Sequence, residues 1–201
     1  STITTSGTRK LLGLAGSLRG ASYSKAVLRT LAEMSWEGVE IEIFDISSIP
    51  LYNADQDGEH PPDPVQRLKT SIGACAGVLV VSPEYNYGIP GVLKNALDWA
   101  SRPAYRSPLV RKPVGIITCC EGTTRGARAQ AAIRDCFSAC LAEVVPYMEV
   151  AIPTVQAKVQ GGKLTDEKSL ALASGLVNAL AVASRDETSH GKRIFLAGAS
   201  G

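Results

Sequence analysis

The sequence has little of what several classes of protein require. It contains two histidines in 201 residues, its aromatic content is 5%, and its formal net charge at pH 7 is only +2. The basic residues are scattered, so there is no continuous patch of the kind that binds nucleic acid. No apolar stretch approaches the roughly 20 residues of a membrane span, and the segment STITTSGTRK lacks the apolar core of a signal peptide. We therefore expect a cytoplasmic protein with no nucleic-acid or membrane partner.

The cysteines and histidines form no motif typical of a metal site. The five cysteines include no C-x-x-C pair and no ligand set with His60 or His190. We interpret the cysteines as reduced and mostly buried, with Cys136 and Cys140 on one face of a helix as small apolar groups. Neither histidine accompanies a G-x-S-x-G nucleophile elbow, so a Ser-His-Asp hydrolase is not indicated. No metal is expected.

Length and composition favour a single domain. With 45% hydrophobic and 20% charged residues, the chain can bury one substantial core, and no repeat or low-complexity block divides it. We predict one domain over residues 1–201, with a core at about 10–183. The polar, glycine-rich tail at 184–201 is expected to be a mobile end or an oligomer contact.

Short apolar runs alternate with segments of helical period along the chain. The predicted strands are residues 10–16, 39–45, 77–82, 113–120 and 143–152. The predicted helices are residues 24–34, the second half of 47–76 after its proline-rich loop, 91–100, 125–143 and 166–183. This order predicts an α/β fold in which a five-stranded parallel sheet carries helices on both faces.

In a doubly wound sheet, ligands bind beyond the carboxyl ends of the strands, where the strand order reverses. The loops after the first, third and fourth predicted strands are therefore the candidate site. Asp45 ends the second strand, as a ribose-binding acid would, but we interpret it as a helix cap.

The first loop, GSLRGASYS at residues 16–24, has the composition of a phosphate site. A helix N-terminus offers unpaired backbone N–H groups, glycine allows close approach, and hydroxyls and arginine add donors. Helix capping would need only one hydroxyl and would leave Arg19 without a role. The loop is neither a G-x-G-x-x-G fingerprint nor a P-loop. The predicted phosphate contacts are Gly16, Ser17, Arg19, Ser22 and Ser24.

The second loop, SPEYNYGIPGVLKNALDW at residues 82–99, follows a fully apolar strand. Its tyrosines, prolines and asparagine would make a stiff, partly aromatic wall suited to a flat heteroaromatic ring. Pro83 and Pro90 restrict the loop, which lowers the entropy cost of presenting it to a ligand. The same residue types are also ordinary turn formers, so the residues alone leave both interpretations open.

Together these two loops resemble the NADPH-dependent FMN reductases of the flavodoxin-like superfamily, which include quinone, azo-dye and chromate reductases. The resemblance covers roughly residues 10–183 and implies a flavodoxin-like three-layer sandwich with strand order 2-1-3-4-5. It implies FMN as cofactor, its phosphate on the first loop and its ring against the second. The implied contacts are Ser17, Arg19, Ser22 and Ser24 for the phosphate, and Pro83, Glu84, Tyr85 and Asn86 for the ring. The family commonly has asparagine in place of Ser24, whose shorter hydroxyl can still donate.

The third loop, TCCEGTTRGARAQ at residues 118–130, resembles the family's segment after the fourth strand, which usually carries paired glycines near the ring. Here TTR separates Gly122 from Gly126. The adjacent Cys119 and Cys120 point to opposite faces of a strand and would bridge only with strain, so packing is favoured over redox chemistry. The candidates for the pyrimidine end of the flavin are Thr118, Cys119, Glu121 and Gly122.

The resemblance implies an enzyme in which the flavin carries the chemistry and no residue acts as catalytic acid or base. Hydride would pass from NADPH or NADH through FMN to a small acceptor, such as free flavin, a quinone, an azo compound, chromate or a ferric chelate, in a ping-pong cycle. Nothing separates NADPH from NADH, because Arg106, Arg111 and Arg125 are equal candidates for a 2′-phosphate.

Two other functions remain open at this point. A flavodoxin-type electron carrier would bind FMN without turning over NAD(P)H, although such carriers are usually strongly acidic and this chain is near neutral. A non-enzymatic flavin-binding module is the other. The family tends to form homodimers or homotetramers, and we expect the helix of residues 88–99, with Trp99, to make the contact.

Overall fold

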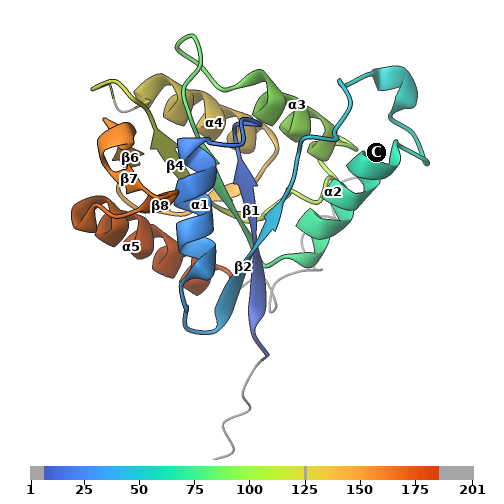
Figure 1. Cartoon of the computed structure of the whole chain (residues 1–201). Coiled ribbons are helices and arrows are strands. Elements are labelled where there is room, and N and C mark those ends of the chain that lie inside the picture. The colour runs from blue at the N-terminus through green and yellow to red at the C-terminus, as the bar shows by residue number, and fades with distance from the viewer. Residues whose placement is uncertain (1–6, 125, 186–201) are drawn as a thin grey trace, which may run out of the picture.

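The computed structural model describes residues 7–124 and 126–185. Its main sheet is parallel throughout and has the strand order β2-β1-β3-β4-β5, with β6 also paired to β4 (Figure 1). The predicted 2-1-3-4-5 order is confirmed. The strands are β1 (Arg9–Ala15), β2 (Val39–Phe44), β3 (Gly77–Ser82), β4 (Pro113–Cys119), β5 (Glu143–Val144) and β6 (Val150–Ile152). A small antiparallel hairpin pairs β7 (Val159–Gln160) with β8 (Lys163–Leu164).

Helices cover both faces of the sheet, as predicted, and they divide the core into two clusters. The helices are α1 (Tyr23–Glu33), α2 (Asp63–Ala74), α3 (Gly91–Ala100), α4 (Ala127–Ala139) and α5 (Glu167–Ala183), with short 3-10 helices η1 (Ala54–Gln56) and η2 (Val155–Ala157). Leu11 and Leu79 pack with α1 and α5, whereas Leu12 and Val80 pack with α2, α3 and α4. Successive side chains of a strand thus pack on opposite faces of the sheet. Both faces are covered by helices, which is why the central strands are apolar without interruption.

The predicted fifth strand over residues 143–152 is wrong in one respect, because the structure divides it. Val144 pairs with Val114 of β4, and Val150 pairs with Ile117, so the chain makes an excursion between the two pairings. Pro146 lies in that excursion, where its lack of an N–H prevents a regular ladder. The excursion brings Tyr147 against α5 at Gly175, where a Cβ would overlap the tyrosine ring.

The connection from β2 to α2 is fastened to α3. Asn95 accepts a hydrogen bond from the Tyr52 backbone N–H and donates one to the Pro50 carbonyl, both at 2.8 Å. The indole N–H of Trp99 donates to the same carbonyl at 2.8 Å. Trp99 is 0% exposed, so its predicted role as an oligomer contact is wrong: its apolar surface is already covered by its own chain.

Three of the other expectations can be compared with the described residues. All five cysteines are free, but only Cys75 and Cys119 are buried, and the other three are half-buried, so the prediction of mostly buried thiols is wrong for those three. Within the described ranges no cluster of three or more His, Cys, Asp or Glu side chains suits a metal ion. No helix in these ranges is long and apolar enough to cross a membrane. The predicted tail lies outside the described residues from position 186 onward.

Candidate functional site

The three predicted loops leave the sheet side by side. Ala15, at the end of β1, pairs with Val81, and Ser82, at the end of β3, pairs with Thr118 of β4. The carboxyl ends of these three adjacent strands are therefore level, and the loops that follow them share one edge of the sheet (Figure 1). The structure thus brings the three sequence segments together at one place.

The first loop begins with a close backbone approach. The N–H of Gly16 donates to the carbonyl of Val81 at 2.9 Å. A Cβ at Gly16 would lie 2.9 Å from the Cβ of Ser82 and still closer to its hydroxyl. Only glycine fits this position without displacing the start of the second loop.

The first loop and the start of α1 contain three serines, which we call the serine cluster. Ser17, Ser22 and Ser24 are all buried. The hydroxyls of Ser22 and Ser24 are 2.8 Å apart, and Ser22 caps the helix by accepting from the Lys25 backbone N–H at 3.3 Å. The first turn of α1 contains no acidic side chain. Backbone donors, hydroxyls and an uncompensated helix dipole fit the phosphate of FMN.

Arg19 lies exposed on the loop that enters α1. Its guanidinium carbon is 5.5 Å from the ring centroid of Tyr23, in a cation–π arrangement. The charge therefore stands at the mouth of the serine cluster rather than inside it.

The second loop is a tight turn that presents aromatic side chains. Tyr85 and Gly88 exchange backbone hydrogen bonds of 3.1 and 3.0 Å around Asn86 and Tyr87, whose φ angles are 49° and 64°. This is the geometry of a two-residue I′ turn, in which a tyrosine is unusual because of its side chain. Tyr85 and Tyr87 are 49% and 72% exposed.

The second loop also contacts the first through a side chain. The hydroxyl of Tyr85 donates to the hydroxyl of Ser17 at 3.2 Å. The sequence predicts Tyr85 only as a ring contact and does not predict this hydrogen bond between the serine cluster and the aromatic turn. Residue type gives no signal for it, because the two positions are 68 residues apart.

Glu84 lies next to the turn, but its side chain reaches α4. Its Oε2 accepts hydrogen bonds from the backbone N–H groups of Arg128 and Ala129, both at 3.0 Å. The N-cap residue of α4 is Gly126, which has a φ of 68° and no side chain with which to cap. Glu84 supplies that cap from another loop, so any contact between Glu84 and a ring would come from its backbone.

A second contact joins the turn to the same helix. The guanidinium carbon of Arg128 lies 4.1 Å from the ring centroid of Tyr87. The second loop therefore touches the first turn of α4 at both Glu84 and Tyr87.

The four flavin contacts predicted on the third loop differ in their exposure to solvent. Thr118 and Cys119 are buried, so only their backbone groups are available near the surface, whereas Glu121 and Gly122 are exposed. Burial raises the pKa of the Cys119 thiol to about 12, and its Sγ lies 3.9 Å from the Ser82 carbonyl. Cys120 is half-buried, as expected for neighbours on opposite strand faces.

The segment after β6 holds the third loop in place. The backbone N–H of Thr154 donates to the Gly122 carbonyl at 3.1 Å, and that of Val155 donates to the Cys120 carbonyl at 3.0 Å. The side-chain amide of Gln156 donates to the Glu121 carbonyl at 3.1 Å.

Two arginines considered for a 2′-phosphate lie away from this edge. Arg106 and Arg111 belong to the connection that enters β4 at its amino end, opposite the three loops. Arg111 is also 3.4 Å from the carboxylate of Glu143, at the start of β5. Their candidacy is therefore wrong on topological grounds, and Arg125 lies outside the described residues.

Comparison with known proteins gives matches over most of the chain. The model of a family described as NADPH-dependent FMN reductase matches residues 9–157. An NAD(P)H-dependent FMN reductase of Pseudomonas aeruginosa is 39% identical over 172 residues, which are 85% of this chain and 92% of that protein. A quinone reductase of Escherichia coli is 38% identical over 174 residues, with the same two coverages. The solved structure of FerB, an NAD(P)H:(acceptor) oxidoreductase of Paracoccus denitrificans, has 31% identity and a TM-score of 0.75, and the alignment covers 89% of this chain and 98% of FerB.

Proposed function

Because the chain belongs to the NADPH-dependent FMN reductase family, we propose that it binds FMN between its three loops and reduces a small acceptor with NADPH or NADH. The family consists of flavin-dependent oxidoreductases. The acceptor class that we favour is the quinones, and the order of events is ping-pong, with donor and acceptor using the same exposed ring face in turn.

The observation that carries this proposal is the serine cluster at the start of α1. Ser17, Ser22 and Ser24 place buried hydroxyls at a helix N-terminus that has no acidic side chain in its first turn. A phosphate would accept hydrogen bonds from these hydroxyls and from the backbone N–H groups beside them. Arg19, exposed at the mouth, would supply the balancing charge.

The other two loops would hold the ring. The segment from Pro83 to Asn86 would lie along one side of it, and Glu121 and Gly122, exposed on the third loop, would meet its pyrimidine end, with Thr118 and Cys119 contributing backbone groups. When bound, FMN supplies reversible two-electron chemistry. The protein then needs no acid or base in these loops, since Glu84 already caps α4 and the buried Cys119 thiol stays protonated.

The exposed aromatic turn favours flat acceptors. Tyr85 and Tyr87 border the site with accessible ring surface, which stacks well on quinones and other planar molecules.

Five free cysteines fit a reducing compartment, so we place the reaction in the cytoplasm. We also propose a single domain over the chain and assembly into a homodimer or homotetramer.

The test is direct. The purified protein is examined for the visible absorbance of bound flavin, and NADPH absorbance is then followed with and without a benzoquinone. We expect a yellow protein that oxidises NADPH rapidly only when the quinone is present. A yellow protein that leaves NADPH unchanged would identify an electron carrier, and a colourless protein that does not take up FMN would overturn the proposal.

A further inference from the structure

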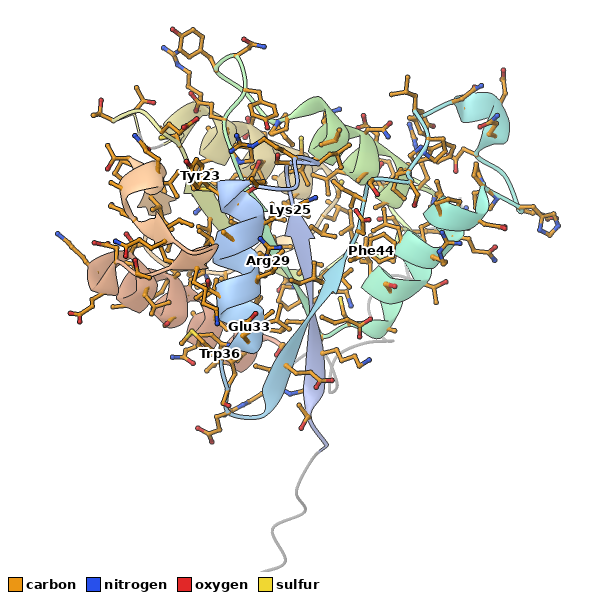
Figure 2. The ribbon with its side chains drawn as sticks, in the orientation of Figure 1. Tyr23, Lys25, Arg29, Glu33, Trp36 and Phe44 are labelled. Carbon is orange, nitrogen blue, oxygen red and sulfur yellow. The ribbon has the colours of Figure 1, made fainter. Side chains whose placement is uncertain are left out.

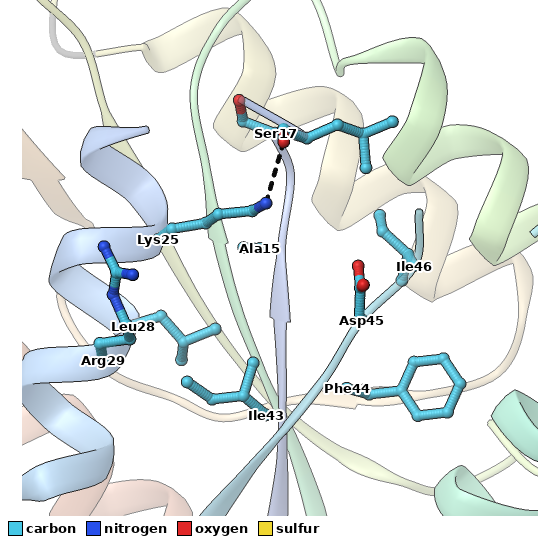
Figure 3. Close-up of a pocket in the computed structure, with 10 residues that line it drawn as sticks. Ala15, Ser17, Lys25, Leu28, Arg29, Ile43, Phe44, Asp45 and Ile46 are labelled. Carbon is cyan, nitrogen blue, oxygen red and sulfur yellow. Dashed lines mark hydrogen bonds between the residues drawn. The ribbon is translucent and has the colours of Figure 1, made fainter. Parts of the chain in front are cut away.

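A pocket of about 210 Å³ opens between α1 and the carboxyl end of β2 (Figure 3). Its described lining comes from β1, the first loop, α1 and residues 43–46, and includes none of the second or third loop. Pockets that enclose a whole drug-sized ligand start at about 300 Å³. This pocket therefore suits one ring system of a larger molecule whose remainder lies outside.

Two cations from α1 border the pocket. Lys25 and Arg29 are four residues apart and so share one face of the helix, the face that Figures 2 and 3 show turned toward β1 and β2. Lys25 uses one donor on the carbonyl of Leu18, at 3.0 Å, which leaves two more. Within residues 7–124 and 126–185 the structure gives the Arg29 guanidinium no hydrogen bond or ion pair. A positively charged rim with unused donors favours an anionic group, above all a phosphate.

The walls of the pocket are apolar and accessible to solvent. Leu18 and Ile43 are 43% and 41% exposed, whereas the ring of Phe44, the next residue of β2, packs against the core on the other face of the sheet (Figure 3). Exposed apolar side chains around one opening favour a flat ring, which would remove their surface from water.

Asp45 adds an acceptor at the same opening. The interpretation of Asp45 as a helix cap is wrong: its two carboxylate oxygens accept from the backbone N–H and hydroxyl of Ser47, at 3.0 and 2.8 Å. These bonds, with the charge of Lys25, lower the pKa of Asp45, so the group is a carboxylate at neutral pH. A carboxylate at the end of a strand next to β1 can accept hydrogen bonds from ribose hydroxyls.

We propose that this pocket binds a phosphorylated adenosine, with the purine against Leu18 and Ile43, the ribose at Asp45 and the phosphate on Arg29 and Lys25. The source of this group is the 2′-phosphoadenosine end of NADPH, an assignment that rests on the proposed function. It makes Arg29 the residue that distinguishes NADPH from NADH. Arg29 makes this distinction because it would bind the 2′-phosphate of NADPH, and NADH has no phosphate at that position.

The test uses calorimetric titration with 2′,5′-ADP, on the purified chain with and without FMN. We expect binding with a Kd below about 1 mM, weakened about tenfold or more in Arg29→Ala, as for loss of one charge-assisted hydrogen bond, and largely restored in Arg29→Lys. Arg67→Ala, which removes an exposed arginine from α2, is the matched control and should bind normally. Absence of binding, or equal binding by wild type and Arg29→Ala, would overturn the proposal.

A kinetic arm identifies the source of the adenosine. If the pocket holds the donor, 2′,5′-ADP raises the KM for NADPH and leaves kcat unchanged, and Arg29→Ala raises the KM for NADPH far more than that for NADH. Binding of 2′,5′-ADP without any effect on either KM would assign the pocket to free adenine nucleotides and overturn its assignment to the donor. A chain that takes up no FMN would overturn the proposed function, while the titration of the FMN-free chain would still report on the pocket.

Discussion

The carboxylate of Glu84 and the backbone N–H of Ala129 are joined by a hydrogen bond of 3.0 Å across 45 positions of sequence. The same oxygen accepts from Arg128, so a residue of the second loop completes the N-terminus of α4. The relative placement of the second and third loops depends on this carboxylate.

Replacing Glu84 tests that dependence. We expect Glu84→Ala to lower the free energy of unfolding by about 1–2 kcal/mol, the usual cost of removing an N-terminal cap, and to weaken FMN binding. Glu84→Gln keeps an acceptor oxygen and should lose less. Urea unfolding and flavin titration measure the two effects, with the exposed Glu59→Ala as control. Wild-type stability in Glu84→Ala would show that α4 does not need the cap.

The serine cluster predicts a preference for FMN over riboflavin. Removing both hydroxyls in Ser22→Ala/Ser24→Ala should weaken FMN binding about tenfold or more, because hydrogen bonds to a charged phosphate are each worth about 1.5–3 kcal/mol. Riboflavin, which has no phosphate, should bind both proteins alike. Fluorescence titration with the two flavins gives the ratio, and the exposed Ser48→Ala is the control. An unchanged ratio would place the phosphate elsewhere.

The contact between Gly16 and Ser82 predicts that substitutions at these two positions have coupled effects on stability. Gly16→Ala should destabilise the fold and reduce flavin binding, because the new Cβ overlaps the Ser82 side chain. Gly16→Ala/Ser82→Gly should recover part of the loss, which a double-mutant cycle of unfolding free energies would detect. Gly20→Ala, with no atom within 4 Å of its Cβ, is the control. Strict additivity of the two substitutions would contradict the contact.

Cys119 predicts a loss of stability in alkali. In the folded protein burial raises the pKa of its thiol from 9.0 to about 12. Well below pH 9 the thiol is protonated in both the folded and the unfolded protein, so it does not change the unfolding free energy with pH. Between about pH 9 and pH 12 only the unfolded thiol ionises, so the unfolding free energy should fall as pH rises. Comparing the pH dependence of wild type and Cys119→Ala isolates this contribution, and parallel curves would contradict it.

Thiol labelling gives a second measurement on the same pair. At pH 8 iodoacetamide should modify the half-buried Cys120 in the native protein and leave the buried Cys119 unmodified until the chain is unfolded. Mass spectrometry of peptides from residues 113–126 would locate the label.

The oligomeric state is a further prediction. We expect a homodimer or homotetramer in sedimentation at micromolar concentration, formed by a surface other than Trp99, which its own chain covers. A monomer under these conditions would contradict the prediction.

The sequence predicts the sheet and the positions of the three loops because both depend on local patterns. β3 and β4 are buried on both faces and read as unbroken apolar runs. Gly16 and the serines lie within nine residues of one another, so their common purpose is visible without a structure.

What the sequence does not predict depends on partners distant in the chain. Nothing local distinguishes Glu84 as a cap for α4, although Gly126 at the start of that helix is a signal that a cap must come from elsewhere. The burial of Trp99 depends on the Pro50 carbonyl, 49 positions away. Pro146 could have indicated a break in the fifth strand, but the apolar residues on both sides of it favoured one continuous element.

The residues around the opening of the site fall into two groups: a frame, whose side chains contact another loop or helix, and a variable part, whose side chains do not. Ser17, Tyr85 and Glu84 belong to the frame, because each holds one loop against another. Asn86 belongs to the variable part, since it is exposed at the tip of the turn, whereas Tyr87 contacts Arg128 of α4 and so belongs to the frame. An engineer who wants a different acceptor should therefore randomise Asn86 and leave the frame untouched, and natural divergence in substrate range should concentrate at that position.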